Sequence, residues 1–451
     1  MGRLLGYTDA GSDATLPKNL ALRGPKPALL TPHGSSSLLE ADSQASPDLP
    51  PFQVHLLEVF QRLRAAVTQA LGAIGADPRR ARELARLLGI SRSLAWRVGR
   101  IATAMEPADA VPHVPGRAAF EVFVRALTTA EVPASTVQTL RQAMSAYDKM
   151  AAVHSADRSS LEQLAAGMTG EGGAAERLEQ GRRQAFLGMG STWGVQAETQ
   201  FRTCIRAPSN DRAEPRTDLA VLEGMVGLRR VRADARWTLF RHRSRMDDGS
   251  VMTAAADEAI DPEGWVNGLP LIKAHCSPSM PSLERIASGA ETSFVLPAGP
   301  VGKTAAFHCV FGEIRRGIFP SVRSAENTEE RLGCLMITPA ERVQFDLIVS
   351  RELPWSHDPE VGLFSMLNGR GPTLVGPGGT NRLPLLEEVH ELGWGPATMA
   401  SPHVPGYVDL LNMAFERGGW DPKSFRGLRF TMRYPPIPTA VVFTSPLPEA
   451  D

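Results

Sequence analysis

Apolar side chains recur at spacings of three and four residues between positions 52 and 74. This pattern predicts one face of an amphipathic helix about six turns long. Gly75 is expected to end the helix. The apolar face consists of Leu56, Phe60, Leu63, Val67, Leu71 and Ile74.

Two shorter helices are predicted directly after the first. Asp77 followed by Pro78 is typical of an N-cap and a first helical residue. The second helix is therefore expected to begin at Pro78 and to stop at Gly89, which can adopt a left-handed conformation. Ser91 can then cap a third helix that runs to about Met105.

The chain after these helices changes character several times. Three prolines predict a stiff linker over residues 107–116. Residues 117–190 again have helical periodicity and are interpreted as a helical connector. Within them, Ser159 and Glu162 have the spacing of a capping box.

Alternating polar and apolar residues predict strands beyond about residue 195, for example in ETQFRTCIRAP. Further strands are expected in KTAAFHCVFGEI, GCLMITP, RVQFDLIVS and TAVVFTSPL. Helices are expected in PSLERIASG and GYVDLLNMAFERGG. Residues 191–451 are therefore interpreted as an α+β domain for oligomerisation or effector sensing. Residues 1–50, rich in Pro, Ser and Gly, are expected to form a disordered arm.

Composition excludes several classes of protein. Hydrophobic residues make up 43% and charged residues 22% of the 451 residues, which is typical of a globular chain. The net charge of −1 excludes a uniformly basic nucleic-acid coat. Four dispersed cysteines are too few for a disulfide scaffold. No signal peptide or membrane-length apolar run is apparent, so a cytoplasmic protein without a membrane partner is expected.

One segment, RRARELARLLGISRSLAWRVGRIATA (residues 79–104), has the pattern of two short helices joined by a sharp turn. Such a unit needs a small residue where its helices touch, and Ala85 occupies that position. It needs a tight turn four residues later, at Gly89, and a capped second helix, at Ser91. The apolar positions that would face a core are Leu84, Leu88, Ile90, Ala95 and Val98.

This segment resembles the helix-turn-helix DNA-binding domains of bacterial transcription regulators, for which ELARLLGIS is typical. The resemblance implies a trihelical domain over residues 51–106 that binds double-stranded DNA as a homodimer. Arg92 and Ser93 are the candidates for reading base edges. Arg79, Arg80 and Arg82 would contact phosphates. The remaining candidate DNA contacts are Ser91, Trp96, Arg97 and Arg100, with Trp96 either against a sugar or base methyl or as a helix anchor.

The charge distribution supports this interpretation. Residues 51–106 contain nine arginines and no lysine against four acidic residues, a net charge of +5. Residues 107–451 carry a net charge of −5. Positive charge is thus concentrated in the part of the chain expected to meet phosphate. Arginine-richness alone counts for little, because 42 of the 48 basic residues of the whole chain are arginines.

A second basic run lies between residues 229 and 245. In a strand over residues 237–246, Arg241, Arg243 and Arg245 would share one face. That face could bind phosphate or an anionic effector, or it could be a solvated strand edge.

The other motifs do not have the spacing of a metal site, a phosphate loop or a catalytic triad. The adjacent pairs His275–Cys276 and His308–Cys309 lack the spacing of a zinc site. GPVGKT (299–304) has two residues between its glycines, where a phosphate loop needs four. SHDPE (356–360) places Ser, His and Asp too close together to form a triad by themselves. No metal, cofactor or catalytic residue is therefore predicted.

Two alternatives to a transcription regulator remain open from the sequence. A DNA-processing enzyme with its catalytic site in residues 191–451 would also use a helix-turn-helix to dock. An assembly or adaptor protein would use the same motif for packing and would bind no DNA.

Overall fold

The computed structural model describes residues 50–168, 171–209, 216–243, 258–266, 268–288, 291–325, 327–367, 375 and 379–449, apart from the side chains of 171–174 and 242–243. The fold is mixed α+β, as predicted, with helices first and a larger strand-rich region after them. The chain divides into two compact units between Arg177 and Leu178, which we call the helical unit and the strand-rich unit. The predicted arm lies outside the described residues.

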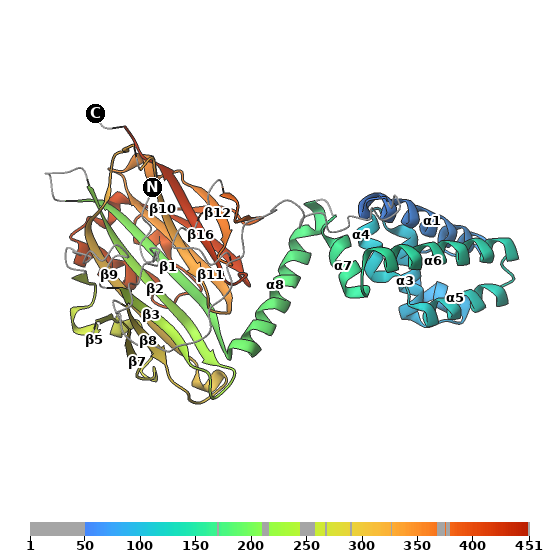
Figure 1. The fold of residues 1–451 in the computed structure, drawn as a ribbon, viewed down its shortest axis with the longest axis horizontal. Coiled ribbons are helices and arrows are strands. Elements are labelled where there is room, and N and C mark those ends of the chain that lie inside the picture. The colour runs from blue at the N-terminus through green and yellow to red at the C-terminus, as the bar shows by residue number, and fades with distance from the viewer. Residues whose placement is uncertain are drawn as a thin grey trace, which may run out of the picture. The chain divides into compact units, whose positions relative to one another are not determined.

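The helical unit is built from eight described helical segments and the start of a ninth (Figure 1). The last of them, α8, continues past the division into the strand-rich unit. Their bounds are α1 (Phe52–Gly72), α2 (Ala81–Leu88), α3 (Arg92–Thr103), α4 (Pro107–Ala110), the 3-10 helix η1 (Val111–His113), α5 (Arg117–Thr129), α6 (Ala134–His154), α7 (Arg158–Ala166) and α8 (Glu171–Trp193).

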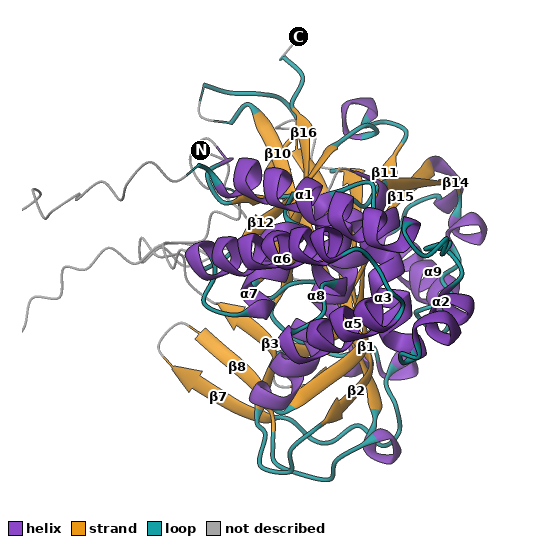
Figure 2. Ribbon diagram, turned by 90° about the vertical axis from the view of Figure 1, so that its right-hand side faces the viewer, coloured by secondary structure: helices purple, strands orange, loops and turns teal. Residues whose placement is uncertain are grey.

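A single apolar core holds most of the helical unit together. Five of the six residues predicted to form the apolar face of the first helix are buried, four of them in this core and Phe60 against Ala104 and Ala110, and Ile74 is partly buried against the core. Helix α6 runs alongside α1, as Figure 2 shows, and adds Leu140, Met144 and Met150 to the core. Residues 117–166 therefore share a core with residues 51–106, and they are not the separate connector that the sequence suggested.

The predicted linker over residues 107–116 is wrong. This segment folds into α4 and η1, and it buries Ala108, Ala110 and Val111. Pro107 stands at the first position of α4, where a proline costs no hydrogen bond and its fixed φ suits a helix. The prolines here start short helices, so their number alone was misleading.

The predicted capping box of α7 is also replaced by another arrangement. The N-cap is Asp157, whose carboxylate accepts a hydrogen bond of 2.8 Å from the backbone N–H of Ser160. A carboxylate is a strong N-cap acceptor and also favours the positive end of the helix dipole. Ser159 consequently lies inside the first turn.

The strand-rich unit contains sixteen described strands and one further α-helix. Their bounds are β1 (Val195–Pro208), β2 (Arg216–Arg230), β3 (Trp237–Arg243), β4 (Glu258–Ala259), β5 (Trp265–Val266), β6 (Leu269–Pro270), β7 (Glu284–Ser288), β8 (Glu291–Leu296), β9 (Phe307–Pro320), β10 (Glu329–Met336), β11 (Ala340–Ser350), β12 (Glu360–Ser365), β13 (Arg382–Leu383), β14 (Val389–Trp394), α9 (Tyr407–Gly418), β15 (Phe425–Arg433) and β16 (Thr439–Pro446). Short 3-10 helices connect several of them, namely η2 (Pro262–Gly264), η3 (Lys273–His275), η4 (Lys303–Ala305), η5 (Pro354–Ser356), η7 (Pro396–Met399) and η8 (Pro422–Ser424).

A seven-stranded sheet forms the centre of this unit, in the order β14-β15-β11-β1-β2-β9-β4. Its neighbours are antiparallel except for β1 and β11, which run parallel. Helix α9 covers one face through Leu410, Leu411 and Phe415. The other face packs against a four-stranded sheet, β10-β16-β12-β13, and against a three-stranded sheet, β3-β8-β7.

One predicted helix of this unit is wrong. PSLERIASG holds the edge strand β7, which pairs with β8 and is exposed along its whole length. Two apolar residues three apart favour a helix, but the signal is weak in so short a segment, and pairing with β8 makes it a strand. The predicted helix in GYVDLLNMAFERGG is confirmed as α9.

A buried polar network attaches α9 to the central sheet. Thr203, Asp346 and Arg429 lie side by side in register on β1, β11 and β15. The Tyr407 hydroxyl of α9 donates to the Asp346 carboxylate at 2.6 Å and lies 2.6 Å from the Thr203 hydroxyl. Arg429 donates to both Asp346 oxygens, at 2.9 and 2.7 Å. Each charged group of the network thus has partners, which offsets the cost of its burial.

We expect Tyr407→Phe to lower the free energy of unfolding of the strand-rich unit by about 1–3 kcal/mol, because it leaves buried partners without a hydrogen bond. Tyr434→Phe is the matched control, since among the described residues its hydroxyl has a single hydrogen bond, from Arg433 at 3.4 Å. Urea unfolding followed by tryptophan fluorescence reports this unit, which holds six of the seven tryptophans. Equal stability of the two variants would contradict the role of the network.

Candidate nucleic-acid interface

The turn between α2 and α3 has the geometry that the sequence predicted. Gly89 ends α2 with φ 63° and ψ 29°, a left-handed conformation that glycine adopts without steric cost. Its N–H and that of Ile90 both donate to the Ala85 carbonyl. Ser91 is the N-cap of α3, and its hydroxyl accepts a 3.2 Å hydrogen bond from the N–H of Leu94. The predicted stop and cap are therefore confirmed.

The residues predicted to face the core do so. Ala95 is completely buried, and Ala85 is partly buried against the same core. A polar face remains exposed on α3 as a consequence. The buried apolar residues of the two helices and their turn include Leu84, Leu88, Ile90, Leu94, Val98 and Ile101.

The predicted start of the second helix is wrong by three residues. Helix α2 begins at Ala81, and Asp77 instead accepts a 2.9 Å hydrogen bond from the N–H of Arg79 within a tight turn. This local side-chain bond competes with helix formation. The turn brings Pro78 against α3, where a Cβ placed on Gly99 would lie 2.2 Å from the Pro78 carbonyl oxygen. Gly99 therefore permits the close approach, a role that the sequence did not indicate.

The solvent face of α3 carries the predicted contact residues. Arg92, Ser93, Trp96 and Arg100 are exposed, and Arg97 is half-buried. Positions 92, 96 and 100 are four residues apart, so they align on one side of the helix, with 93 and 97 beside them. Trp96 is 49% exposed and is therefore not a core anchor.

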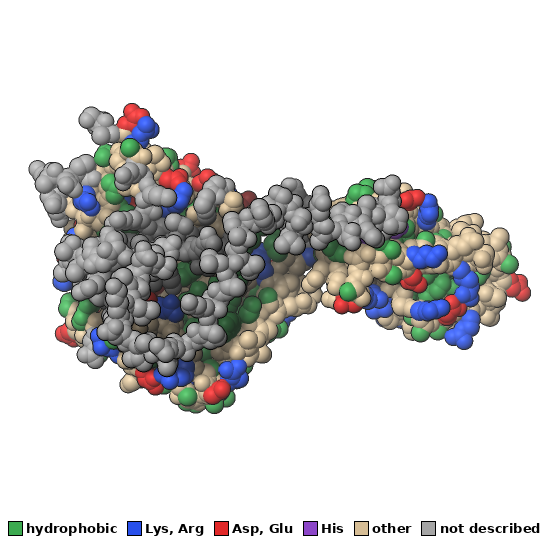
Figure 3. Space-filling model, viewed as in Figure 1, with side chains coloured by type: hydrophobic (Ala, Val, Ile, Leu, Met, Phe, Trp, Pro, Cys, Tyr) green, Lys and Arg blue, Asp and Glu red, His purple; other side chains and the backbone are tan. Residues whose placement is uncertain are grey.

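Among the described residues, no acid pairs with the arginines of α2 and α3. Within the described residues, the guanidinium groups of Arg82, Arg86, Arg92, Arg97 and Arg100 form no hydrogen bond or ion pair. The sequence analysis did not single out Arg86, which is exposed in the last turn of α2. Figure 3 shows basic side chains gathered over the part of the helical unit that holds α3 and α5.

Arg80 differs from the other predicted phosphate contacts. Its guanidinium lies 3.2 Å from Glu83 and 3.5 Å from Asp77. The three groups are exposed, so these pairs contribute little to stability, but they cancel the positive charge locally. Arg79 lies next to this turn and, like Arg82, has no ion pair within the described residues.

Acidic partners compensate most of the described arginines in the second basic run. Arg229 pairs with Glu341 at 3.0 Å, Arg232 with Asp234 at 3.1 Å, and Arg236 with Glu284. Arg230 donates to the Pro297 carbonyl. Glu341 and Glu284 lie on β11 and β7, so the sequence could not reveal these two partners, whereas Asp234 is only two residues from Arg232. This run therefore presents much less net charge than its sequence suggests.

The candidate secondary surface for anions, formed by Arg241, Arg243 and Arg245, is only partly described. Arg241 is exposed on β3, at the edge of the three-stranded sheet, and lies 4.0 Å from Glu291. The side chain of Arg243 and the whole of Arg245 lie outside the described residues. The edge position agrees with the solvated-edge interpretation weighed for this run.

One contact next to α3 joins residues that are distant in the sequence. The rings of Trp96 and His113 meet edge to face, with centroids 4.8 Å apart. Burial lowers the pKa of His113, and the positive charges of Arg100 and Arg97 lower it further. This contact could not be predicted from the sequence pattern, which favours a linker where η1 forms.

The remaining motifs show no assembled chemistry in the described part of the chain. No group of three or more His, Cys, Asp or Glu residues there is arranged to hold a metal ion. Burial raises the pKa of Cys309 to about 12, so this thiol is a packing group. In SHDPE, the His357 Nε2 lies 3.0 Å from the backbone carbonyl of Ser350, so it is not poised to activate a hydroxyl.

GPVGKT leads into the single-turn η4 and then into β9, whereas a phosphate loop leads into a helix. None of the described helices combines the length and hydrophobicity that a bilayer crossing requires.

We expect Gly99→Ala to lower the free energy of unfolding of the helical unit by about 1–3 kcal/mol, because the new methyl overlaps a backbone carbonyl that cannot move aside. Gly72→Ala, at the end of α1 in open space, is the control and should be neutral or slightly stabilising. Urea unfolding followed by circular dichroism at 222 nm measures both. A Gly99→Ala protein as stable as Gly72→Ala would show that α3 does not lie against Pro78.

Comparison with known proteins adds no further guide. No known protein family matches this chain, and no curated protein matches it either. The geometry and charge of the helical unit are therefore the basis for its proposed function.

Proposed function

We propose that the helical unit binds double-stranded DNA, with α1, α2 and α3 acting as a trihelical helix-turn-helix domain and α3 as the recognition helix. The observation that carries this proposal is the set of five arginines on α2 and α3 without an acidic partner within the described residues. Uncompensated arginines on an exposed helix face repel one another, and a line of phosphates relieves that repulsion.

The residues of α2 and α3 would make two kinds of contact with DNA, to base edges and to phosphates. Arg92 and Ser93 stand at the start of α3, the end of a recognition helix that reaches base edges in the major groove. Arginine can pair bidentately with guanine, so Arg92 would contribute sequence preference. Arg82 and Arg86, on the helix before it, would contact phosphates and fix the orientation of α3.

Trp96, Arg97 and Arg100 continue the face along α3. The indole of Trp96 offers an exposed apolar edge that suits a thymine methyl or a sugar. Arg97 and Arg100 would meet the backbone of the duplex where α3 leaves the groove. Ser91 would act indirectly, because its hydroxyl is used to cap the helix.

On this basis we propose a transcription regulator that acts by occupying DNA and carries out no chemistry. A homodimer would place two copies of α3 in successive major grooves, about 34 Å apart. The strand-rich unit would then supply oligomerisation or effector sensing. The first role requires that the intact chain oligomerises on DNA. The second requires that an effector changes its affinity for DNA.

We predict that affinity for duplex DNA falls steeply with salt. Four phosphate contacts, from Arg82, Arg86, Arg97 and Arg100, give a slope of about −3.6 in log K against log salt, or a loss of about 10²-fold between 50 and 200 mM. Arg92→Ala/Arg97→Ala should remove sequence selection through the loss of Arg92 and reduce this slope by about one through the loss of Arg97. Fluorescence anisotropy with random and genomic fragments measures both quantities.

The matched control is Arg62→Ala/Arg141→Ala, which removes the same charge from two arginines of the helical unit that are already paired, with Glu58 and Glu121. Its affinity and slope should stay close to those of the unaltered protein. If both double variants lose affinity equally, net charge and not α3 determines binding. If no protein binds at low salt, the motif is a packing element.

A second prediction separates the two kinds of contact. Arg82→Ala should weaken binding to all sequences alike and lower the salt slope by about one. Arg92→Ala should cost about 1–3 kcal/mol on the preferred sequence only. Competition between the selected sequence and a scrambled one resolves the difference. The division of roles fails if Arg82→Ala changes sequence preference and Arg92→Ala does not.

A further inference from the structure

The surface of the helical unit continues from α3 onto η1 at His113. The His113 ring packs edge to face against Trp96, and the side chain remains half-buried rather than enclosed. Its ring nitrogens form no hydrogen bond with any described residue. The imidazole is thus held in place by packing while its polar atoms are not committed to a protein partner.

The charges that face His113 are mostly positive. Arg97 and Arg100 approach it from α3, Arg158 from α7 and Asp109 from α4. Asp109 is itself paired with Arg177 at 3.0 Å. Arg158 is fixed between Glu162 and the Pro112 carbonyl, both at 2.8 Å, so it also holds η1 in position. Around His113, the two α3 arginines are therefore the charges without an ion-pair partner among the described residues.

We propose that the DNA-contact surface extends from α3 to η1 and that His113 contacts a DNA phosphate as an imidazolium, so that binding takes up a proton. This inference rests on the proposed function. It adds one phosphate contact that the arginine pattern alone does not supply, and it makes DNA affinity depend on pH near neutrality.

The sign of the dependence follows from the surroundings of the ring. In the free protein, burial and the adjacent Arg100 and Arg97 hold the pKa of His113 below its usual 6.5. A phosphate beside the ring favours the charged form and raises that pKa in the complex. Protons are then taken up on binding between the two pKa values. Affinity rises as pH falls through this window and levels off below the pKa of the free protein.

The test is DNA affinity between pH 5.5 and 8.0 at constant ionic strength, for the intact chain and for His113→Gln. A pKa difference of one unit gives about a tenfold rise in affinity toward acid pH. His113→Gln should lack that rise and keep the affinity of the unaltered protein at pH 8. At pH 5.5 the salt slope of the unaltered protein should be steeper by about 0.9 than at pH 8.

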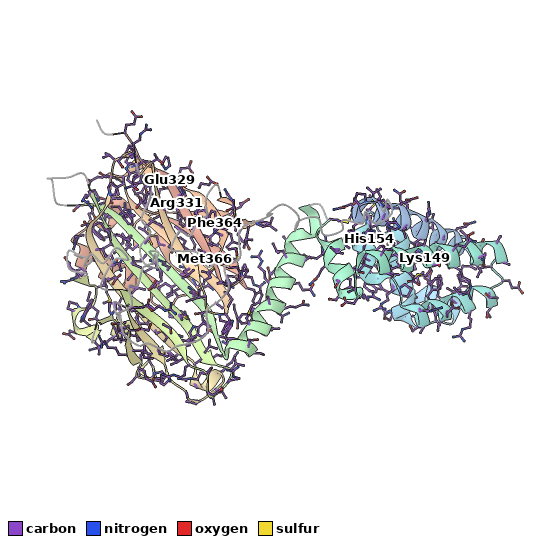
Figure 4. All side chains as sticks on the ribbon, viewed as in Figure 1. Lys149, His154, Glu329, Arg331, Phe364 and Met366 are labelled. Carbon is purple, nitrogen blue, oxygen red and sulfur yellow. The ribbon has the colours of Figure 1, made fainter. Side chains whose placement is uncertain are left out.

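Other histidines of the helical unit need a control. His55 and His154, which is labelled on α6 in Figure 4, lie 3.0 Å apart through their ring nitrogens. Burial and the neighbouring His55 lower the pKa of His154. His154→Gln should retain the full pH dependence of DNA affinity.

The pKa of His113 itself, measured by NMR with and without duplex DNA, tests the same inference in the unaltered protein. A higher value in the complex supports it. An unchanged or lower value overturns it, as do parallel pH profiles for the unaltered protein and His113→Gln. Absence of DNA binding at every pH and at low salt would instead reject the proposed function, and this inference with it.

Discussion

The left-handed turn at Gly89 determines which face of α3 meets solvent. Because the turn is short, the direction of α2 and the burial of Leu84 and Leu88 fix the rotation of α3 about its axis. Ala95 and Val98 then enter the core, and the arginines of α3 are left outside. Gly99 adds a second constraint, since it lets α3 lie directly against the backbone at Pro78. The proposed interface therefore depends on two glycines that contribute no contact of their own.

Some arginines of this protein are balanced by acids and others are not. In the strand-rich unit, the buried Arg206 and Arg429 have acidic partners, Glu330 at 2.5 Å and Asp346 at 2.7 Å. On α2 and α3, five arginines have none within the described residues. Such an arrangement adds repulsion to the folded state and gives no stability in return. The apolar core of the helical unit has to offset it, and an anionic partner is the simplest reason for keeping it.

Local features of the sequence predicted local features of the fold. The apolar face of α1, the stop at Gly89, the cap at Ser91 and helix α9 depend on residues close together in the chain. Errors arose where two local patterns competed. Prolines read as a linker begin α4, and the segment PSLERIASG pairs as the edge strand β7.

Contacts between residues that are distant in the chain could not be predicted from the sequence. Alternation predicted the strand that contains Arg206, but it did not predict that both faces of the central sheet are covered and that Arg206 is completely buried. Equally, the run of arginines near residue 230 is as basic in sequence as the run on α3, but two of its arginines pair with acids on other strands. The Trp96–His113 contact depends on the same kind of information, because it forms only when η1 folds back against α3.

The central claim is that the exposed face of α3 lies against DNA. Photo-crosslinking tests it most directly, with p-benzoylphenylalanine placed either at position 93 of α3 or at position 68, which is exposed on α1. With duplex DNA at low salt, we expect a crosslink from position 93 that salt abolishes, and little or none from position 68. DNA that binds tightly but crosslinks from position 68 and not from position 93 would contradict it.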